Sequence, residues 1–268
     1  MKLLAIETIR INFEKIKEID NEVKSIYRLI TFSRHHLDDD LLDAFLTGMH
    51  KLKELVSIKN AQMEAQTDDE AKEYLKNLRI ALDFIADEIK SHRNFEKEVQ
   101  LFQLFRLVSP ETHAEHPNHY RHSLVQIGSY VCPDQSEVPM LVSDLFYRMQ
   151  SISNPIIRAI YFHHELIRIH FFLDGNGRVT RIAKNWMFMY ELYPPIFIND
   201  VSQKREYITT LGNSFRELNN SQNVWNEFTA QFFEQELDRL LINAKRLYDV
   251  VNQIGIEREK SMKVASAG

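Results

Sequence analysis

The sequence has little cysteine, little glycine and no long apolar run, and each shortage excludes a class of protein. The single cysteine, Cys132, excludes an internal disulfide and is typical of proteins kept in a reducing cytosol. No uninterrupted apolar stretch is long enough to span a bilayer, and the N-terminus becomes charged too soon for a secretory signal peptide. We therefore expect a soluble, cytoplasmic protein.

Neither sign of charge is in large excess. The 268 residues include 38 Asp and Glu against 33 Lys and Arg, which gives a net charge of −5 and a pI of about 6.1. This balance offers no electrostatic basis for binding nucleic acid or an anionic membrane, so we expect neither as a partner. Hydrophobic residues make up 44% of the chain, which is enough for a substantial core.

Apolar residues recur at intervals of three and four through most of the chain, which predicts an all-α fold. The segment that starts at Thr67 is the clearest helix, because Thr-Asp-Asp-Glu is a capping signal. The helical bundle that we expect has helices over residues 3–30, 38–58, 67–92, 95–108, 139–149, 155–170, 177–192, 204–215 and 223–254.

The stretch between residues 109 and 138 departs from this helical pattern. Two prolines and three histidines predict a loop over 109–119, and alternating β-branched residues around Gly128 predict one short β-hairpin at about 123–138. On this pattern the chain divides into an N-terminal helical region (1–108), a core (109–235) and a C-terminal helix and tail (236–268).

Two of only seven glycines lie in one segment, HFFLDGNGRVTR, which begins at His170. A helix is expected to end there and another to begin near Gly177, so the free N–H groups of the second helix would form an anion site. Arg178 and Arg181 lie one turn apart, and the Asn176 side chain could add a donor. Asp174 would repel phosphates unless Mg²⁺ lies between them. His170 is the only nearby side chain that ordinarily accepts a proton near neutral pH.

The same segment matches H-x-F-x-D-G-N-G-R-x-x-R at every fixed position, and it resembles the signature of the Fic (Fido) family. The family commonly has proline after the histidine, where this chain has Phe171. The segments NPIIRAIYFHHELIRIH and HYRHSLVQIGSYVCPDQSEVP resemble the family's preceding helix and the arginine-marked start of its β-hairpin flap. The resemblance covers about residues 54–233 and implies a Fic-type helical bundle with an N-terminal helical extension.

The resemblance implies a protein adenylyltransferase that transfers AMP from ATP to a Ser, Thr or Tyr hydroxyl of a protein and releases pyrophosphate. His170 would deprotonate the hydroxyl, Asp174 would bind Mg²⁺, and Phe172 would pack in the core and position the loop. The residues implied to bind the phosphates are Gly175, Asn176, Gly177, Arg178 and Arg181. The flap residues implied to hold the target segment as an added strand are Val125, Gln126, Ile127 and Gly128. Self-modification and a homodimer both stay open.

Many members of the family carry an inhibitory helix, S/T-x-x-x-E-G/N, whose glutamate pairs with the second arginine of the motif. The nearest match is NAQMEAQT, within a degenerate helix expected near residues 55–67. Glu64 would then hold the inhibitory position, although Asn60 and Ala65 replace the serine and glycine of the motif. The alternative is that Glu64 is an ordinary solvated helix residue.

Several other interpretations compete with this one. HHELIRIH lacks the spacing of a zinc protease helix, because Arg168 stands where the second histidine is needed. Related phosphate kinases have lysine at the position of Gly177. Transfer of UMP or phosphocholine, and a non-catalytic helical interaction module, stay open. The loosely spaced histidines that could bind zinc are His113, His116, His119 and His122. The residues that could line an adenine pocket or simply pack in the core are Tyr207, Leu211 and Phe228.

Overall fold

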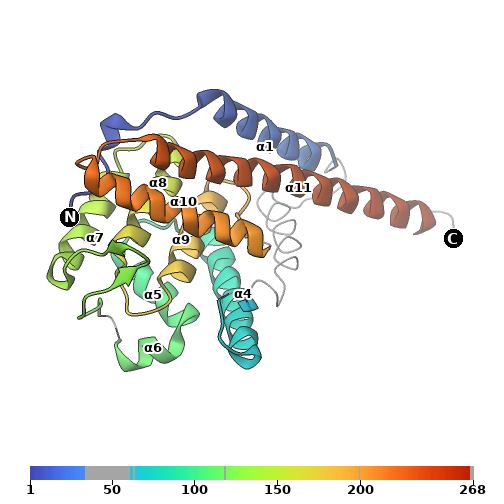
Figure 1. Cartoon of the computed structure of the whole chain (residues 1–268). Helices are drawn as coiled ribbons and strands as arrows, with labels where there is room; N and C mark the ends of the chain where they lie inside the picture. Colours follow the sequence, from blue (N-terminus) through green and yellow to red (C-terminus); the bar gives the residue numbers. More distant parts are fainter. Residues whose placement is uncertain (34–60, 63, 118, 199, 266–268) are drawn as a thin grey trace.

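The computed structural model describes the chain except for residues 34–60, 63, 118, 199 and 266–268. The helix expected over 38–58, and much of the segment expected to be inhibitory, lie outside the described residues. Where the chain is described, it forms a bundle of α-helices with one two-stranded hairpin, which confirms the all-α prediction (Figure 1). Its described helices include none that is long and apolar enough to cross a membrane.

The elements follow one another as in Figure 1. The helices are α1 (Phe13–Ser33), α4 (Asp68–Lys90), α5 (Glu98–Val108), α6 (Pro110–Glu115), α7 (Val138–Met149), α8 (Pro155–Ile169), α9 (Asn176–Tyr190), α10 (Val201–Asn220) and α11 (Glu227–Ala265). The strands are β1 (Gln126–Ile127) and β2 (Tyr130–Val131), and short 3-10 turns lie at Ile6–Thr8 and Gln135–Glu137.

Helices α8 and α9 form the centre of the bundle, because nearly every face of both is buried. His163 and Ile167 on α8, and Ile182 and Trp186 on α9, are all buried. Helix α7 packs on α8, and α4 and α5 pack on α9. The two central helices therefore hold the segment between them against a rigid support.

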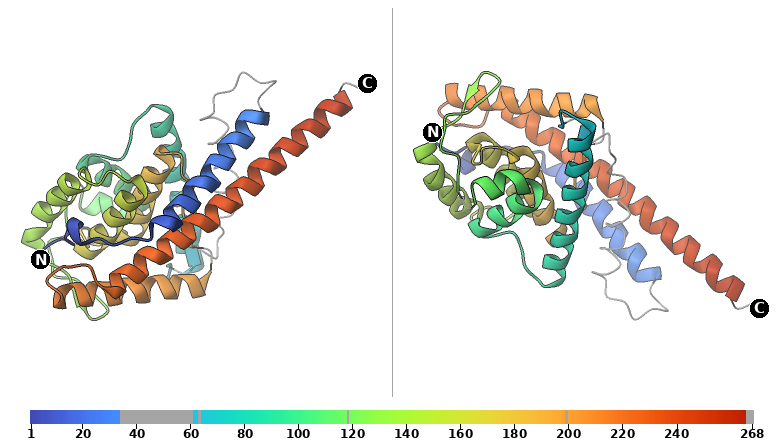
Figure 2. Two further views of the ribbon diagram at one scale, coloured as in Figure 1. Left: turned by 90° about the horizontal axis from the view of Figure 1, so that it is seen from above. Right: turned by 90° about the horizontal axis from the view of Figure 1, so that it is seen from below.

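Helices α10 and α11 pack on each other and cover one side of this centre (Figure 1). Helix α1 runs alongside α11 in both views of Figure 2, and α11 continues beyond the body of the molecule. The start of α10 lies on the same side of the molecule as α4 (Figure 1), and Glu64 and Lys204 meet there beside Arg181, in the second turn of α9.

Capping side chains fix where α4 and α8 begin. The Thr67 hydroxyl accepts a hydrogen bond from the Glu70 amide (3.2 Å), and the Glu70 carboxylate accepts one from the Gln66 amide (2.7 Å). The Asn154 side chain accepts a hydrogen bond from the Ile157 amide (3.0 Å), and Pro155 takes the first position of α8. The capping signal predicted at Thr67 is confirmed.

Two sequence predictions were wrong in detail. The first helix was expected from residue 3 but begins at Phe13, because Leu3 and Leu4 are buried as an extended segment against the core. The region 109–119, expected to be a loop, contains α6, since Pro110 stands at its first position and Glu111 in its first turn.

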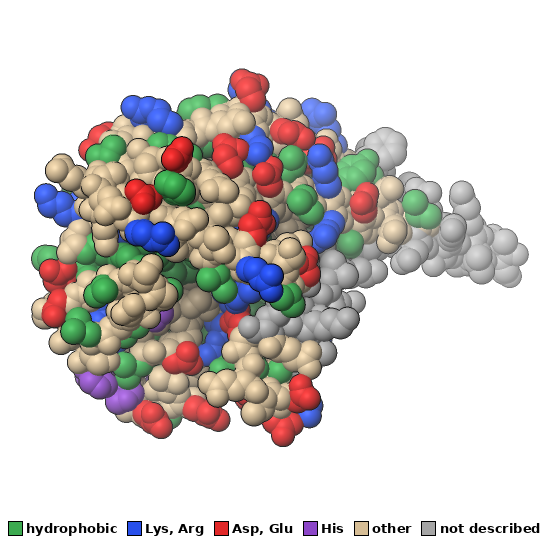
Figure 3. Space-filling model, in the orientation of Figure 1, with side chains coloured by type: hydrophobic (Ala, Val, Ile, Leu, Met, Phe, Trp, Pro, Cys, Tyr) green, Lys and Arg blue, Asp and Glu red, His purple; other side chains and the backbone are tan. Residues whose placement is uncertain are grey.

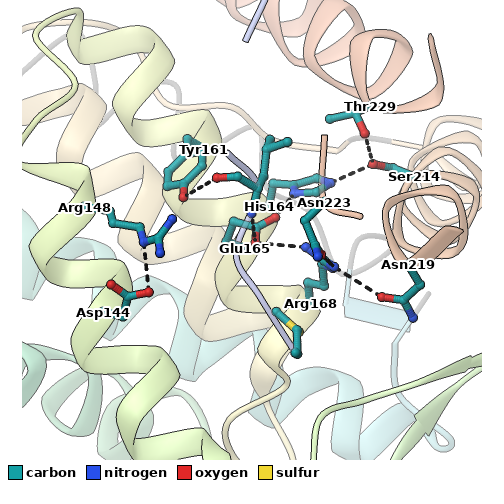
Figure 4. A network of polar contacts seen from close by, with 12 residues as sticks. Asp144, Arg148, Tyr161, His164, Glu165, Arg168, Ser214, Asn219, Asn223 and Thr229 are labelled. Carbon is teal, nitrogen blue, oxygen red and sulfur yellow. Dashed lines mark hydrogen bonds and ion pairs between the residues drawn. The ribbon is translucent and has the colours of Figure 1, made fainter. Parts of the chain in front are cut away.

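A buried polar network ties the N-terminal segment to α8, α10 and the start of α11 (Figure 4). Glu165 on α8 accepts hydrogen bonds from the Leu4 amide (3.0 Å) and from Arg168 (3.2 Å). His164 contacts Glu165 (2.8 Å) and Ser214 (2.9 Å), and both ring nitrogens are therefore occupied. His164 and Arg168, both in HHELIRIH, thus have structural roles in α8.

Candidate active site

The segment between α8 and α9 changes direction through two left-handed residues. His170 caps α8 with φ 52° and ψ 66°, and its amide donates to the carbonyls of Leu166 and Ile167. Gly175 has φ 74° and precedes α9, which starts at Asn176, one residue before the expected start. The break that the glycines predicted is therefore present, with the N-terminus of α9 facing the loop.

Gly175 and Gly177 each have a side chain close to the position that a Cβ would take. A Cβ on Gly175 would lie 2.5 Å from the Ser109 hydroxyl, and one on Gly177 would lie 3.1 Å from Nη1 of Arg181. Gly175 is required by both its backbone angle and this close approach. Gly177 allows the Arg181 guanidinium to lie across the first turn of α9.

Gly175→Ala should lower the free energy of unfolding by about 1–3 kcal/mol, because a left-handed Ala residue is strained and its methyl group would strike Ser109. Gly212→Ala is the matched control. Gly212 lies inside α10 with nothing within 4 Å of an added Cβ, so this change should stabilise by about 0.5–1 kcal/mol. Urea unfolding of both variants checks the pair, and equal stability would contradict the strained loop.

Asn176 and Phe172 hold the loop in shape. The Asn176 side chain accepts from the Phe172 amide (2.8 Å) and donates to the Phe172 carbonyl (2.7 Å), and the Phe172 ring stacks on Phe105 with centroids 4.0 Å apart. Phe171 is also fully buried. The Asn176 side chain, expected to be a donor to a ligand, therefore bonds within the loop, and its backbone N–H lies in the first turn of α9.

His170 lies at the edge of the cavity with its ring partly buried. Burial and the nearby Arg121 guanidinium lower the pKa of His170 to about 4, whereas Asp174 acts in the opposite direction. The imidazole is therefore neutral at pH 7 and able to accept a proton.

Arg121 joins the end of α8 to the hairpin. Its buried guanidinium donates to the carbonyls of His170 (2.6 Å), Ser123 (2.7 Å) and Pro133, and its amide donates to Phe171 (2.9 Å). The sequence identified this arginine only as the start of the flap. Its burial among carbonyl groups on both sides of the flap has no signature in a single sequence.

The flap is the β1–β2 hairpin, within the predicted region 123–138. Ile127 pairs with Tyr130 around the two-residue turn that begins at Gly128, whose φ of 59° suits a tight hairpin. Gln126 and Gly128 are exposed, whereas Val125 and Ile127 are half-buried. Arg121 links the base of this hairpin to the backbone carbonyl of His170.

Arg178 and Asp174 contact each other at the start of α9. Arg178 donates to the Asp174 carboxylate (2.8 Å) and to the Val108 carbonyl (3.1 Å), and its guanidinium lies 3.7 Å from the centre of the Tyr74 ring. Asp174 is largely exposed. Its carboxylate can therefore exchange Arg178 for a cation that accompanies phosphates.

Glu64 is paired with Arg181. Its Oε1 accepts hydrogen bonds from Nη2 of Arg181 and from Nζ of Lys204, and 23% of the Glu64 side chain is exposed. Burial raises the pKa of Glu64, but Arg181 and Lys204 outweigh it and lower the pKa to about 2. Glu64 is thus a partly buried ionised group, unlike a solvated helix glutamate.

The loop residues, Glu64 and Tyr74 line one cavity. Its lining residues are Glu64, Tyr74, His170, Leu173, Asp174, Gly175, Asn176, Gly177 and Arg178. In the space-filling view the surface is hollowed between α10 and the α4 and α6 side, and acidic and basic atoms meet in the hollow (Figure 3). A second, more apolar pocket shares Glu64, Tyr74 and Arg178 and also includes Arg181 and Lys204.

The residues considered for an adenine pocket are not among those that line the two pockets. Tyr207 and Leu211 are buried in the core, where the Tyr207 hydroxyl contacts Nε2 of His163 (3.0 Å) and the Tyr207 side chain also hydrogen-bonds Arg181. Phe228 is half-buried on α11. Among the described residues, no group of three or more His, Cys, Asp or Glu could hold a metal ion. Sequence reasoning missed Lys204 and Tyr74, because neither belongs to a motif and both reach the site from distant helices.

Comparisons with known proteins agree with this geometry. Residues 51–188, just over half of the chain, match the Fic/DOC family. The protein adenylyltransferase Fic of Drosophila persimilis is 30% identical over 128 residues, which span 46% of this chain and 24% of that protein. The protein of the same name from Culex quinquefasciatus is 26% identical over 149 residues, 54% of this chain and 30% of that protein.

The chain thus spans only about a quarter of the length of these curated relatives. A Fic-domain signalling protein of Bacteroides thetaiotaomicron has a similar fold, with a TM-score of 0.69 at 19% identity over 89% of this chain and 98% of that one. The family match, the intact loop and the shared fold lead to one conclusion. The chain belongs to the Fic/DOC family.

Proposed function

We propose that this chain is a protein adenylyltransferase, which transfers AMP from ATP to a Ser, Thr or Tyr hydroxyl of a cytoplasmic protein. One observation carries the proposal: a neutral imidazole and the N-terminus of a helix border the same cavity. A base and an anion site in one cavity suit the attack of a hydroxyl on a phosphate. The names of the curated relatives support the same activity.

The reaction needs one proton acceptor and support for a leaving pyrophosphate. His170 takes the proton of the target hydroxyl, the hydroxyl oxygen bonds to the α-phosphorus, and the bond to the β-phosphate oxygen breaks. The amides of Gly175, Asn176 and Gly177 hold the inner phosphates, and Arg178 and Arg181 neutralise the outer ones. AMP-protein, pyrophosphate and one proton are the products.

Asp174 suits Mg²⁺, since it supplies an exposed carboxylate oxygen on the wall of the cavity that would hold the phosphates. A bound Mg²⁺ would neutralise charge on the phosphates and on pyrophosphate as it departs. The Arg178 side chain that now holds Asp174 would then be free to contact an outer phosphate.

The same proposal assigns Glu64 an inhibitory role. Its carboxylate accepts a hydrogen bond from Arg181, whose guanidinium would otherwise contact an outer phosphate. A nucleotide that enters beside this pair would lack one phosphate contact and would lie in a pose unsuited to in-line attack. The chain in this conformation would therefore be a weak enzyme.

Labelled nucleotides test the proposed activity. The protein is incubated with cell lysate and ATP labelled at either the α- or the γ-phosphate. Compared with lysate alone, the added protein should increase label from α-ATP on one or more proteins, including the chain itself, and should not increase label from γ-ATP. Transfer from UTP or from a choline-containing nucleotide instead would favour those donors. No label from any donor would favour a non-catalytic interaction module.

EDTA should stop the transfer, and added Mg²⁺ should restore it. The physical reason is that Asp174 is the carboxylate in this cavity placed to hold a cation beside the phosphates. Asp174→Asn should reduce the rate and raise the Mg²⁺ concentration that gives half-maximal activity. Activity that is indifferent to EDTA would remove Asp174 from this role.

A further inference from the structure

Lys204 lies at the candidate phosphate site although no motif includes it. It stands in the first turn of α10, whose start is fixed by Asp200 accepting a hydrogen bond from the Gln203 amide (2.8 Å). Its Nζ donates to Glu64 Oε1, the same oxygen that accepts from Arg181, and 15% of its side chain is exposed. Two cations from different helices thus converge on one oxygen.

The charges around this oxygen require an anion. Arg178, Arg181 and Lys204 line one pocket, and Glu64 is the only carboxylate among its lining residues. Burial and the neighbouring Arg181 lower the pKa of Lys204 to about 8, while Glu64 acts in the opposite direction. If Glu64 left without a replacement, partly buried like charges would remain uncompensated.

The position of Glu64 Oε1 indicates which anion could replace the Glu64 carboxylate. Arg181 lies across Gly177, with Nη1 3.1 Å from the position of a Cβ there, so its guanidinium spans the first turn of α9. A phosphate oxygen placed where Glu64 Oε1 now lies would be next to that helix N-terminus. It would also receive the same two charged donors, from Arg181 and Lys204.

We propose that Lys204 is a nucleotide-binding residue, which exchanges the Glu64 carboxylate for the terminal phosphate of ATP. The proposal rests on the proposed function, because it assumes that ATP binds at the start of α9. It adds a residue from α10 to a site otherwise built from the α8–α9 loop, and it makes Lys204 a partner of Glu64 before ATP binds.

Binding measurements in the Glu64→Gly variant isolate this role, because Lys204 then has no Glu64 to contact. The ligands are AMP and an ATP analogue with a methylene bridge between the α- and β-phosphorus, which cannot transfer AMP; both are measured with Mg²⁺ by calorimetry. Adding Lys204→Met should weaken binding of the analogue about tenfold, since a charge-assisted hydrogen bond is lost. AMP, which lacks the outer phosphates, should bind almost as before.

Two control variants make the result specific. Lys204→Arg keeps the charge and should retain most of the affinity for the analogue. Arg205→Met removes an exposed charge from the next position of α10 and should change neither affinity. Thermal unfolding of each variant confirms that the fold is retained.

Equal losses for AMP and the analogue, or no loss for either, would overturn the role of Lys204 while leaving the proposed function intact. Failure of the Glu64→Gly variant to bind either ligand would refute the nucleotide site itself, and the inference with it. A loss confined to the analogue supports the proposal, even if the transfer reaction proves to use a different donor.

Discussion

His170→Ala should reduce AMP transfer by about a hundred- to ten-thousand-fold, because a positioned general base contributes that much. The imidazole is neutral at pH 7 and lies at the rim of the cavity, so the folded protein presents there a side chain that can accept a proton. ATP affinity should change little, since the expected phosphate contacts come from the amides and arginines that follow the loop. Transfer of α-label to protein and calorimetric ATP binding measure the two quantities separately.

His119→Ala is the matched control for this variant. His119 is exposed and lies in the segment before the flap, so its removal should leave transfer unchanged. Wild-type transfer by His170→Ala would show that the histidine only caps α8. A parallel loss of ATP affinity and transfer would indicate instead that the loop had lost its shape.

Glu64→Gly should raise self-modification and target labelling by about a hundredfold, since a misplaced reactant costs about that factor. The change removes the carboxylate that now holds Arg181 and Lys204, and both cations become free for the outer phosphate. ATP should also bind more tightly. Initial rates of self-labelling at equal ATP concentration compare the variant with the wild type.

Two further variants show whether the charge of Glu64 itself matters: Glu64→Gln, and Glu73→Gln as the control. Glu64→Gln keeps the shape of the side chain but weakens both contacts, so it should give an intermediate rate. Glu73 is exposed on α4 and pairs with Lys76, so Glu73→Gln should have no effect. Equal rates for all variants would mean that Glu64 does not inhibit this enzyme.

Local patterns in the sequence were sufficient to predict most of the described helices and the break between α8 and α9. Periodic apolar residues, the Thr67 cap and the Pro155 start specify α4 and α8 through contacts within a few residues. The segment from Leu3 to Ile11 has the same periodicity, yet it is not an α-helix. Docking of Leu3 and Leu4 on the core decided its conformation, and that contact is not local.

Apart from Glu64, whose pairing with Arg181 was expected from a degenerate copy of a second motif, the site was predicted only as far as the segment HFFLDGNGRVTR extends. His170, Asp174 and Arg178 lie within nine residues of one another, and their proximity follows from the chain itself. Lys204 reaches the site through the packing of α10 on α11 and of α8 on α9, a consequence of the whole fold. For Asn176 the sequence was misleading instead. The residue type suggested a side chain that contacts a ligand, but this side chain is hydrogen-bonded to the backbone of Phe172.

The polar network on α8 indicates how much of the chain is needed for the segment matched to the family to fold. Leu4 donates to Glu165, the Tyr161 hydroxyl donates to Leu4, and Ser214 and Asn223 close the other side of the same group. The residues matched to the family end at 188, yet buried charged and polar groups within them find their partners before residue 10 and after residue 210. An excised piece bounded by the match would expose or orphan those groups. The segment matched to the family therefore cannot be expected to fold alone, and the flanking parts of this chain belong to its minimal folding unit.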